Sequence, residues 1–307
     1  MSSDIVLKTH NLGKRYKNRW AVKSLNLTVP RGEVFGFLGP NGAGKSTTIR
    51  MMLSLVRPSV GHVELFGRRL HSYRSEVLAR VGGFVEGADF YQYLSARKNL
   101  EIIASLAGGF PRRTIDDALN LVGLLSRADD KVKTFSHGMK QRLGIAQALL
   151  GDPEMVILDE PTAGLDPQGI KEVRELVKRL SVERGLTVFL SSHLLSEIEQ
   201  TATSMAIINL GELAVQGKVG ELLDAGDSVV RIEATPLHEA QALILKQPFV
   251  KSVRQSDHFL EVSMALEQVG VLNALLVQAA VEVHSLIPRR SLEDYFLSIT
   301  EGATDIR

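Results

Sequence analysis

The chain has 307 residues, of which 44% are hydrophobic and 23% charged, a composition ordinary for a globular protein of two domains. Its 36 Lys and Arg residues nearly balance 35 Asp and Glu residues, so a net charge of +1 gives no basic field for nucleic acid. The absence of cysteine excludes disulfides and thiolate metal sites. The N-terminal segment lacks the apolar core of a signal peptide, and no uncharged apolar run reaches the roughly 18 residues that span a bilayer, so we expect a cytoplasmic protein.

Short apolar runs alternate with helical patterns along the first two-thirds of the chain. Four runs are predicted to be buried strands, at residues 34–38, 155–158, 187–190 and 205–209. Helices are predicted at residues 47–55, about 168–184 and 194–201. This alternation favours a largely parallel α/β sheet, which places ligands at the carboxyl ends of its strands. Between the first two strands, a stretch of about residues 90–150 is rich in helical patterns and predicts a helical insertion.

The pattern thins near residues 224–227, which predicts a linker between a nucleotide-binding domain of residues 1–224 and an accessory domain of residues 228–307. The tail predicts strands and helices in the order β-α-β-β-α-β, the order of a small ferredoxin-like α+β domain. The predicted segments are residues 228–233, 236–246, 249–254, 258–263, 266–280 and 281–286. A short amphipathic helix at residues 291–299 is predicted to close the chain.

A glycine-rich segment follows the first predicted strand. Residues 39–46 fit G-x-x-x-x-G-K-S/T, in which backbone amides surround phosphate groups and glycines allow the approach. Lys45 would place its charge on the β- and γ-phosphates, and Ser46 would offer a hydroxyl to Mg²⁺. A helix starting near Thr47 would direct its positive end at the same groups. The predicted nucleotide-binding residues here are Gly39, Pro40, Asn41, Gly42, Ala43, Gly44, Lys45, Ser46 and Thr47.

Two acids follow the second predicted strand. Asp159 emerges at its carboxyl end and could hold Mg²⁺ through water, and Glu160 could polarise the attacking water. His193 follows the third strand, where a donor to the γ-phosphate is wanted. The predicted catalytic set is therefore Lys45, Glu160 and His193. Five other histidines have no such context and are expected to have no chemical role: His62, His71, His238, His258 and His284.

With these residues in hand, the chain resembles the ATP-binding cassette family, and within it the ATPase subunits of bacterial antibiotic and drug exporters of the bacitracin-transporter type. The resemblance covers nearly the whole chain. Residues 135–139 match the family's LSGGQ signature, which implies that Ser136 and Gly138 contact the ATP of a partner subunit in a head-to-tail dimer. His137 replaces the usual first glycine and is expected to be a tolerated surface side chain.

Three further positions match family motifs. Tyr16 matches the aromatic residue that stacks on adenine, and Asp166 matches the D-loop aspartate. Glu86 stands where the family's Q-loop has glutamine. A carboxylate can also ligate Mg²⁺, and the bacitracin-type subgroup resembles this chain here, so Glu86 is expected to be a metal ligand.

The segment after the Q-loop receives the membrane subunit in this family. Here it contains Phe90, Tyr91 and Tyr93, large side chains that suit an interface in a chain with only 6% aromatic residues. Core packing within the helical insertion is an equally weighted alternative for any one ring.

The resemblance implies a P-loop ATPase cassette that uses ATP and Mg²⁺ to export an antibiotic, peptide, drug or lipid-like cargo. It also implies an integral-membrane permease as partner, a homodimer, and a place on the inner face of the cell membrane. One alternative is a soluble, non-transport ATPase of the family, disfavoured because the chain has one cassette and no heptad run between Lys45 and Asp159. The other is an importer ATPase, whose OB-like tail differs from the tail predicted here.

Overall fold

The computed structural model describes residues 4–85, 89–225, 228–256 and 258–290 of the chain. It divides into two compact units at Val219 and Gly220. Each unit is described by itself below.

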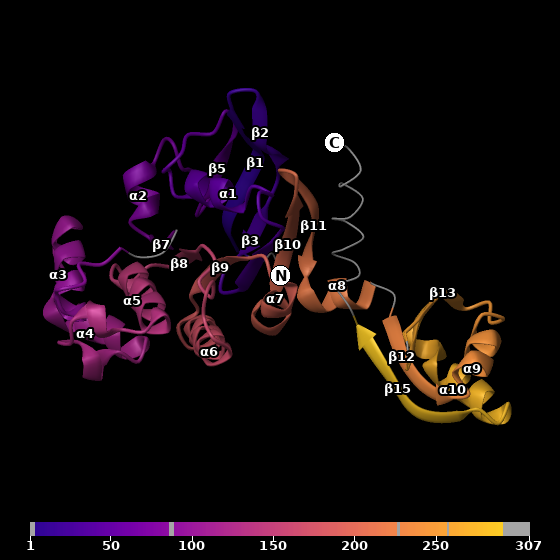
Figure 1. Ribbon diagram of the computed structural model, residues 1–307. Coiled ribbons are helices and arrows are strands. Elements are labelled where there is room, and N and C mark those ends of the chain that lie inside the picture. The colour runs from indigo at the N-terminus through magenta and orange to yellow at the C-terminus, as the bar shows by residue number, and fades with distance from the viewer. Residues whose placement is uncertain (1–3, 86–88, 226–227, 257, 291–307) are drawn as a thin grey trace. The chain divides into compact units, whose positions relative to one another are not determined.

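A six-stranded sheet forms the centre of the first unit, with the strand order β11-β10-β4-β9-β8-β7 (Figure 1). Its strands are β4 (Val34–Leu38), β7 (Val81–Phe84), β8 (Met155–Leu158), β9 (Thr187–Ser192), β10 (Ser204–Asn209) and β11 (Glu212–Lys218). Five strands run parallel and β11 pairs antiparallel at the edge. Every residue of β4, β8 and β9 is buried, which explains their continuous apolar runs. The predicted parallel sheet is confirmed.

Three helices of this sheet were predicted, two of them within one residue of their observed bounds, whereas the first begins two residues before the predicted range of 47–55 and ends three residues before its end. They are α1 (Lys45–Met52), α6 (Pro167–Arg184) and α7 (Leu195–Thr201). For α6, the Asp166 carboxylate accepts a hydrogen bond from the Gly169 amide at 2.8 Å, and Pro167 occupies the first helical position. Gly185 ends the helix in the left-handed conformation, at φ +64°.

The predicted helical insertion lies between β7 and β8. It contains α3 (Ala96–Leu106), α4 (Arg112–Leu121), α5 (His137–Leu149) and two short 3₁₀ turns, Leu125–Arg127 and Val132–Thr134. The described part of residues 85–154 holds no named strand. A five-residue helix, α2 (Arg74–Leu78), precedes β7. In Figure 1, α3 and α4 lie at one end of the unit, away from α1.

A second sheet in this unit was not predicted from the sequence. It consists of β1 (Ile5–Tyr16), β2 (Arg19–Leu25), β3 (Thr28–Pro30), β5 (Val60–Leu65) and β6 (Arg68–Arg69), all paired antiparallel. The long strand β1 pairs with three others, and its register shifts between His10 and Gly13 against β5 and again after Leu12 against β2. These irregularities break the alternation of buried and exposed residues, so β1 carries no clean strand pattern.

The second unit has the predicted order of elements. After α8 (Val219–Ala225) come β12 (Ser228–Thr235), α9 (Leu237–Ile244), β13 (Val250–Gln255), β14 (Leu260–Met264), a 3₁₀ turn (Leu266–Gln268), α10 (Val269–Gln278) and β15 (Glu282–Arg290). The four strands form one antiparallel sheet in the order β13-β14-β12-β15, with its own apolar core against α9 and α10. The linker predicted from residue 224 instead begins inside α8, and the predicted helix of residues 291–299 lies outside the described residues.

Candidate active site

The glycine-rich segment forms the turn between β4 and α1. The Gly39 amide donates a hydrogen bond to the Ser192 carbonyl at 3.3 Å, which ties the loop to the end of β9. Gly44 caps α1 at φ +110°, and a Cβ there would lie 2.5 Å from the backbone oxygen of Ala21. Glycine is therefore required at position 44, and the loop passes directly beneath the antiparallel sheet.

A cavity of about 370 Å³ opens at this loop. It is lined by Tyr16, Arg19, Ala21, Asn41, Gly42, Gly44, Lys45, Ser46, Thr47 and Glu160. Seven of the residues predicted to bind nucleotide are in this set, together with the predicted base. Gly39, Pro40 and Ala43 do not line the cavity, although the carbonyls of Gly39 and Pro40 lie 2.7 Å and 3.4 Å from the Lys45 amine. Arg19 and Ala21 come from β2, which the sequence did not indicate.

Three predicted catalytic side chains form a chain of contacts at the loop. The Lys45 Nζ lies 3.2 Å from Glu160 Oε1, and Glu160 Oε2 lies 3.1 Å from His193 Nδ1. Lys45 is 5% exposed, whereas Glu160 is 28% and His193 39% exposed, so this row of three side chains runs from the interior towards solvent. Residues from α1 and from the ends of β8 and β9 therefore meet at one point.

Asp159 occupies the buried end of β8. Its Oδ1 accepts a 2.6 Å hydrogen bond from the Ser191 hydroxyl, and the same hydroxyl accepts one from the Glu160 amide at 2.9 Å. Glu160 itself has φ +46°, a conformation costly for a residue with a side chain. Ser191 thus fixes both acids, a role not predicted from its position in the Ser191-Ser192-His193 run.

The signature residues lie elsewhere on the unit. Ser136, Gly138 and Asp166 line a cavity of about 440 Å³ that shares no residue with the glycine-loop cavity. Ser136 caps α5, accepting a hydrogen bond from the Met139 amide at 3.2 Å. His137 is exposed as predicted, but its Nε2 lies 3.1 Å from the Ala163 carbonyl and so links the signature to the loop before α6. Glu86 lies outside the described residues.

Tyr91 and Tyr93 are exposed by 53% and 67%, and their rings contact edge to face with centroids 6.2 Å apart. The buried Asn99 side chain holds the Tyr91 backbone through two hydrogen bonds, of 2.8 Å to its amide and 3.1 Å to its carbonyl. These two rings are therefore not part of the core, and Phe90 is partly buried.

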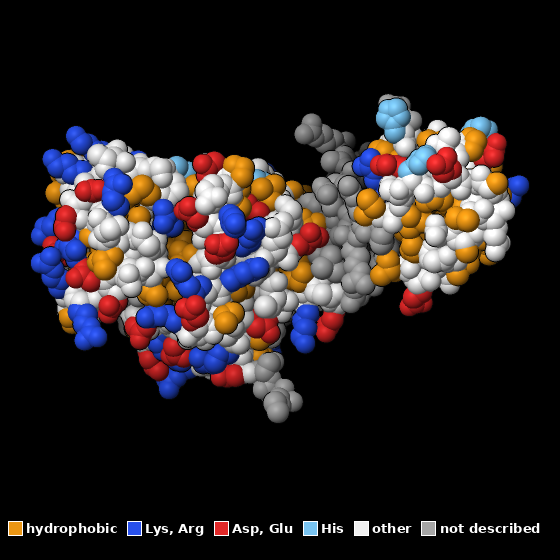
Figure 2. Space-filling model, turned by 90° about the horizontal axis from the view of Figure 1, so that it is seen from below, with side chains coloured by type: hydrophobic (Ala, Val, Ile, Leu, Met, Phe, Trp, Pro, Cys, Tyr) orange, Lys and Arg blue, Asp and Glu red, His pale blue; other side chains and the backbone are white. Residues whose placement is uncertain are grey.

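The surface charge and the helices of the described residues agree with the composition. On the face drawn in Figure 2, basic and acidic side chains of the first unit are interspersed. In the described residues, no helix combines the length and apolar character needed to cross a bilayer.

These features define a class of protein. A glycine loop that joins a parallel strand to a helix, with a buried lysine and a carboxylate at the end of a nearby strand, is the site of a P-loop nucleotide-binding ATPase. The sequence profile of the ABC transporter family matches residues 22–163. The chain belongs to the ATP-binding proteins of this family.

Two relatives and one solved structure give the extent of the similarity. The bacitracin transport ATP-binding protein BcrA of Bacillus licheniformis is 42% identical over 97% of this chain and 98% of its own. The linearmycin resistance ATP-binding protein LnrL of Bacillus subtilis (strain 168) is 33% identical over 96% and 98%. A dimeric ATP-binding cassette solved in a post-hydrolysis state with ADP and Pi is 26% identical, covers 69% of this chain and 98% of its own, and superposes with a TM-score of 0.62.

Proposed function

We propose that this chain is the ATP-hydrolysing motor subunit of an exporter that moves an antibiotic, peptide, drug or lipid-like cargo through a separate permease. The contacts among Lys45, Glu160 and His193 carry the proposal, because they gather at one loop the charges that phosphoryl transfer to water requires. The cargo class is supported by the names of the relatives, which are a bacitracin transport protein and a linearmycin resistance protein.

In the proposed reaction, Lys45 leaves its contact with Glu160 to neutralise charge on the β- and γ-phosphates, and Tyr16 stacks on the adenine. Glu160 is then free to accept a proton from the attacking water, while His193 holds the γ-phosphate and Glu160 in register. The buried amine and the fixed acid match these roles, since neither side chain must reorganise far.

A magnesium ion fits the residues around Asp159. The carboxylate is 6% exposed, has one oxygen held by Ser191, and has no ion-pair partner among the described residues, so its other oxygen is available to a cation. Ser46 lines the glycine-loop cavity, and Glu86 is the third proposed ligand. When bound, the ion would offset negative charge on the phosphates.

The second nucleotide-binding subunit is proposed to be another copy of the chain. Ser136, Gly138 and Asp166 stand outside the glycine-loop cavity, as residues that serve a partner's nucleotide would. The N-terminus of the 13-residue helix α5 adds a positive dipole at Ser136. The dimeric cassette among the solved structures supports this arrangement.

The permease is proposed to dock on Tyr91 and Tyr93 at the inner face of the membrane. Both rings are exposed, and Asn99 anchors the backbone that presents them, so little entropy is lost on binding. A motor on this face has direct access to ATP. The accessory unit from residue 228 onward is proposed as a separate regulatory or docking domain.

The export function is testable in a bacitracin-sensitive host that expresses the chain together with a candidate permease. We expect resistance that is lost in Lys45→Ala. If the complex hydrolyses ATP but confers no resistance to any peptide or drug tested, the proposal that the chain belongs to an exporter is wrong. A soluble non-transport ATPase or an importer would then be preferred.

A further inference from the structure

A cluster on the antiparallel sheet has no part in the proposed reaction. His10 of β1 lies directly opposite His62 of β5, and Glu64 is two residues beyond His62 on the same strand. Because alternate residues of a strand share one face, all three side chains project together. The intervening residues Thr9 and Val63 are buried on the other face, at 1% and 3% exposure.

The three side chains converge on one another. His10 Nε2 lies 3.1 Å from Glu64 Oε2, and His62 Nε2 lies 3.2 Å from Glu64 Oε1. The two imidazole rings stack with centroids 4.6 Å apart. Each side chain is only about one-third exposed, and all three ligand atoms lie within 4.8 Å of one another. Ligand atoms of a tetrahedral zinc ion are about 3.4 Å apart, so small movements would suffice to hold one.

One polar atom of this cluster lacks a hydrogen-bond partner, although His62 Nε2 and Glu64 Oε1 form a hydrogen bond of 3.2 Å. His10 Nε2 is a buried atom 3.1 Å from Glu64 Oε2 and forms no hydrogen bond in the described structure. Burial alone would raise the pKa of Glu64, but its contacts with the two imidazoles outweigh burial and hold the pKa below the usual range. The carboxylate is therefore an anion with two ring nitrogens beside it.

The backbone holds these ligands in place. Gly61 precedes His62 at φ +71°, and a Cβ there would lie 2.2 Å from the Asn11 oxygen and 2.3 Å from the His10 oxygen. The strands therefore approach closely beside the cluster, where His10 pairs with His62 just before the register shift between His10 and Gly13. A preorganised donor set lowers the entropic cost of binding an ion.

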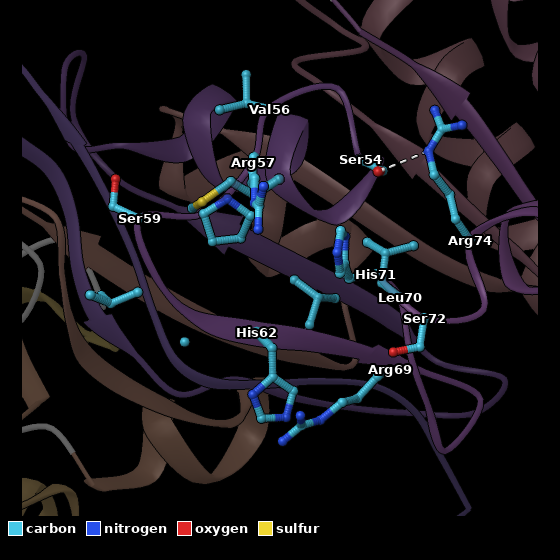
Figure 3. Close-up of a pocket in the computed structure, with 15 residues that line it drawn as sticks. Ser54, Val56, Arg57, Ser59, His62, Arg69, Leu70, His71, Ser72 and Arg74 are labelled. Atoms are coloured by element: carbon cyan, nitrogen blue, oxygen red, sulfur yellow. Dashed lines mark hydrogen bonds between the residues drawn. The ribbon is translucent and has the colours of Figure 1, made fainter.

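A cavity of about 620 Å³ borders the cluster at His62, whereas His10 and Glu64 do not line it. Figure 3 shows His62 beside Arg69 at one side of this cavity, with His71 farther in. Lys8 and Arg69 face Glu64 on the neighbouring strands. Their charges weaken binding of a dication, so we expect micromolar rather than nanomolar affinity.

We propose that His10, His62 and Glu64 bind a divalent transition-metal ion of the zinc class, with water completing its coordination. Two imidazole nitrogens and one carboxylate select zinc, copper or nickel over magnesium, which prefers oxygen ligands. The ion would tie β1 to β5 in the sheet that carries Tyr16. His62 was expected from the sequence to have no chemical role. The cluster could not be predicted, because the alignment of His62 with His10 depends on a sheet that the sequence did not reveal.

The test uses the full-length chain without an oligohistidine tag, at about pH 7.5, where imidazole is neutral. Zn²⁺ is titrated against a chromogenic chelator in excess Mg²⁺, which occupies oxygen-rich sites. We expect one Zn²⁺ per chain, with affinity reduced at least about 100-fold in His10→Gln and His62→Gln. His71→Gln, which changes a histidine of the same cavity outside the cluster, should bind like the parent.

Co²⁺ provides a second readout, since its visible absorption reports direct coordination. The band should appear with the parent and with His71→Gln, and disappear with His62→Gln. Melting in EDTA checks that each variant folds, and Glu64→Gln replaces any that does not. Equal Zn²⁺ affinity in the parent and the cluster variants overturns the proposal, as does a parent that responds to protons but takes up no metal.

Discussion

Glu160 has a left-handed backbone conformation, and its carboxylate contacts Lys45 on one side and His193 on the other. These contacts fix the orientation of the carboxylate. Glu160→Gln keeps the shape and removes the base. We expect ATP binding to persist and turnover to fall about 10²–10⁴-fold. Steady-state phosphate release and binding of a fluorescent ATP analogue measure the two quantities. Glu175→Gln, an exposed change on α6, is the control, and a Glu160→Gln enzyme as fast as the control would refute the assignment.

Ser191 is the residue that aims both acids, since one hydroxyl contacts Asp159 and the Glu160 amide. Ser191→Ala leaves buried polar atoms unpaired and should cost about 1–3 kcal/mol of stability. As a positioning residue it should also lower kcat and raise the Mg²⁺ concentration needed for half-maximal rate. Ser181→Ala removes a different hydrogen bond, to Gly32, and should lower stability alone. Matching kinetics in the two variants would show that Ser191 is only structural.

The importance of Ser191 could not be read from the sequence. Asp159 and Ser191 are adjacent because β8 and β9 pair in the sheet, although the whole of α6 separates the two strands in the chain. Lys45, Asp159 and Glu160 could be predicted because each belongs to a short local pattern next to an apolar strand. Contacts that depend on strand order leave no local pattern.

At the level of elements, one acid connects three loops at the amino ends of parallel strands. Glu154, before β8, contacts Arg80 Nε at 2.5 Å and Arg31 Nη1 at 2.7 Å. Hydrogen bonds from Arg80 and then Arg31 lower the pKa of Glu154 from 4.5 to about 2. Because the pKa of Glu154 is lower in the folded chain than in the unfolded chain, the ionised carboxylate contributes its full stabilisation above pH 4.5. This stabilisation is lost as the pH falls from 4.5 towards 2.

We therefore expect Glu154→Gln to melt below the parent near neutral pH and to converge with it as the pH approaches 2. Because Glu154 is 39% exposed, solvent screening reduces the effect to about 1 kcal/mol, or about 2–4 °C. Calorimetric melting at a series of pH values measures the gap. Arg80→Gln should shrink the pH-dependent part, and a gap that stays constant with pH would exclude this linkage.

Some strands could be predicted from the sequence pattern and others could not. Strands β4 and β8 were predicted at their observed bounds because both faces are covered and the sequence is uniformly apolar. The antiparallel sheet was missed because bulges in β1 interrupt its alternation and because β6 has only two residues. Consequently Arg19 and Ala21, which line the nucleotide cavity from β2, were missed as well.

At the scale of the whole molecule, changing the exposed rings Tyr91 and Tyr93 tests whether the chain docks a permease. Replacing both with Ala should leave the ATPase rate of the isolated chain nearly unchanged. If the rings dock the permease, each change costs about 2 kcal/mol or more of binding. Co-purification from permease-containing membranes should then fail and export should stop. Val182→Ala, which changes an apolar side chain that is 85% exposed on α6, should do neither. A folded double variant that still exports cargo would place the coupling surface elsewhere.

The separation of the glycine-loop cavity from the cavity of Ser136 has a consequence for mixtures of variants. If one catalytic centre draws Lys45 from one copy and Ser136 from another, two inactive variants can repair each other. Lys45→Ala and Ser136→Ala, mixed in equal amounts, should regain about a quarter of the parental rate, because half of the pairs are mixed and each mixed pair has one intact centre. Neither variant alone should approach that rate, and a mixture as inactive as its components would mean that each copy works with its own residues only.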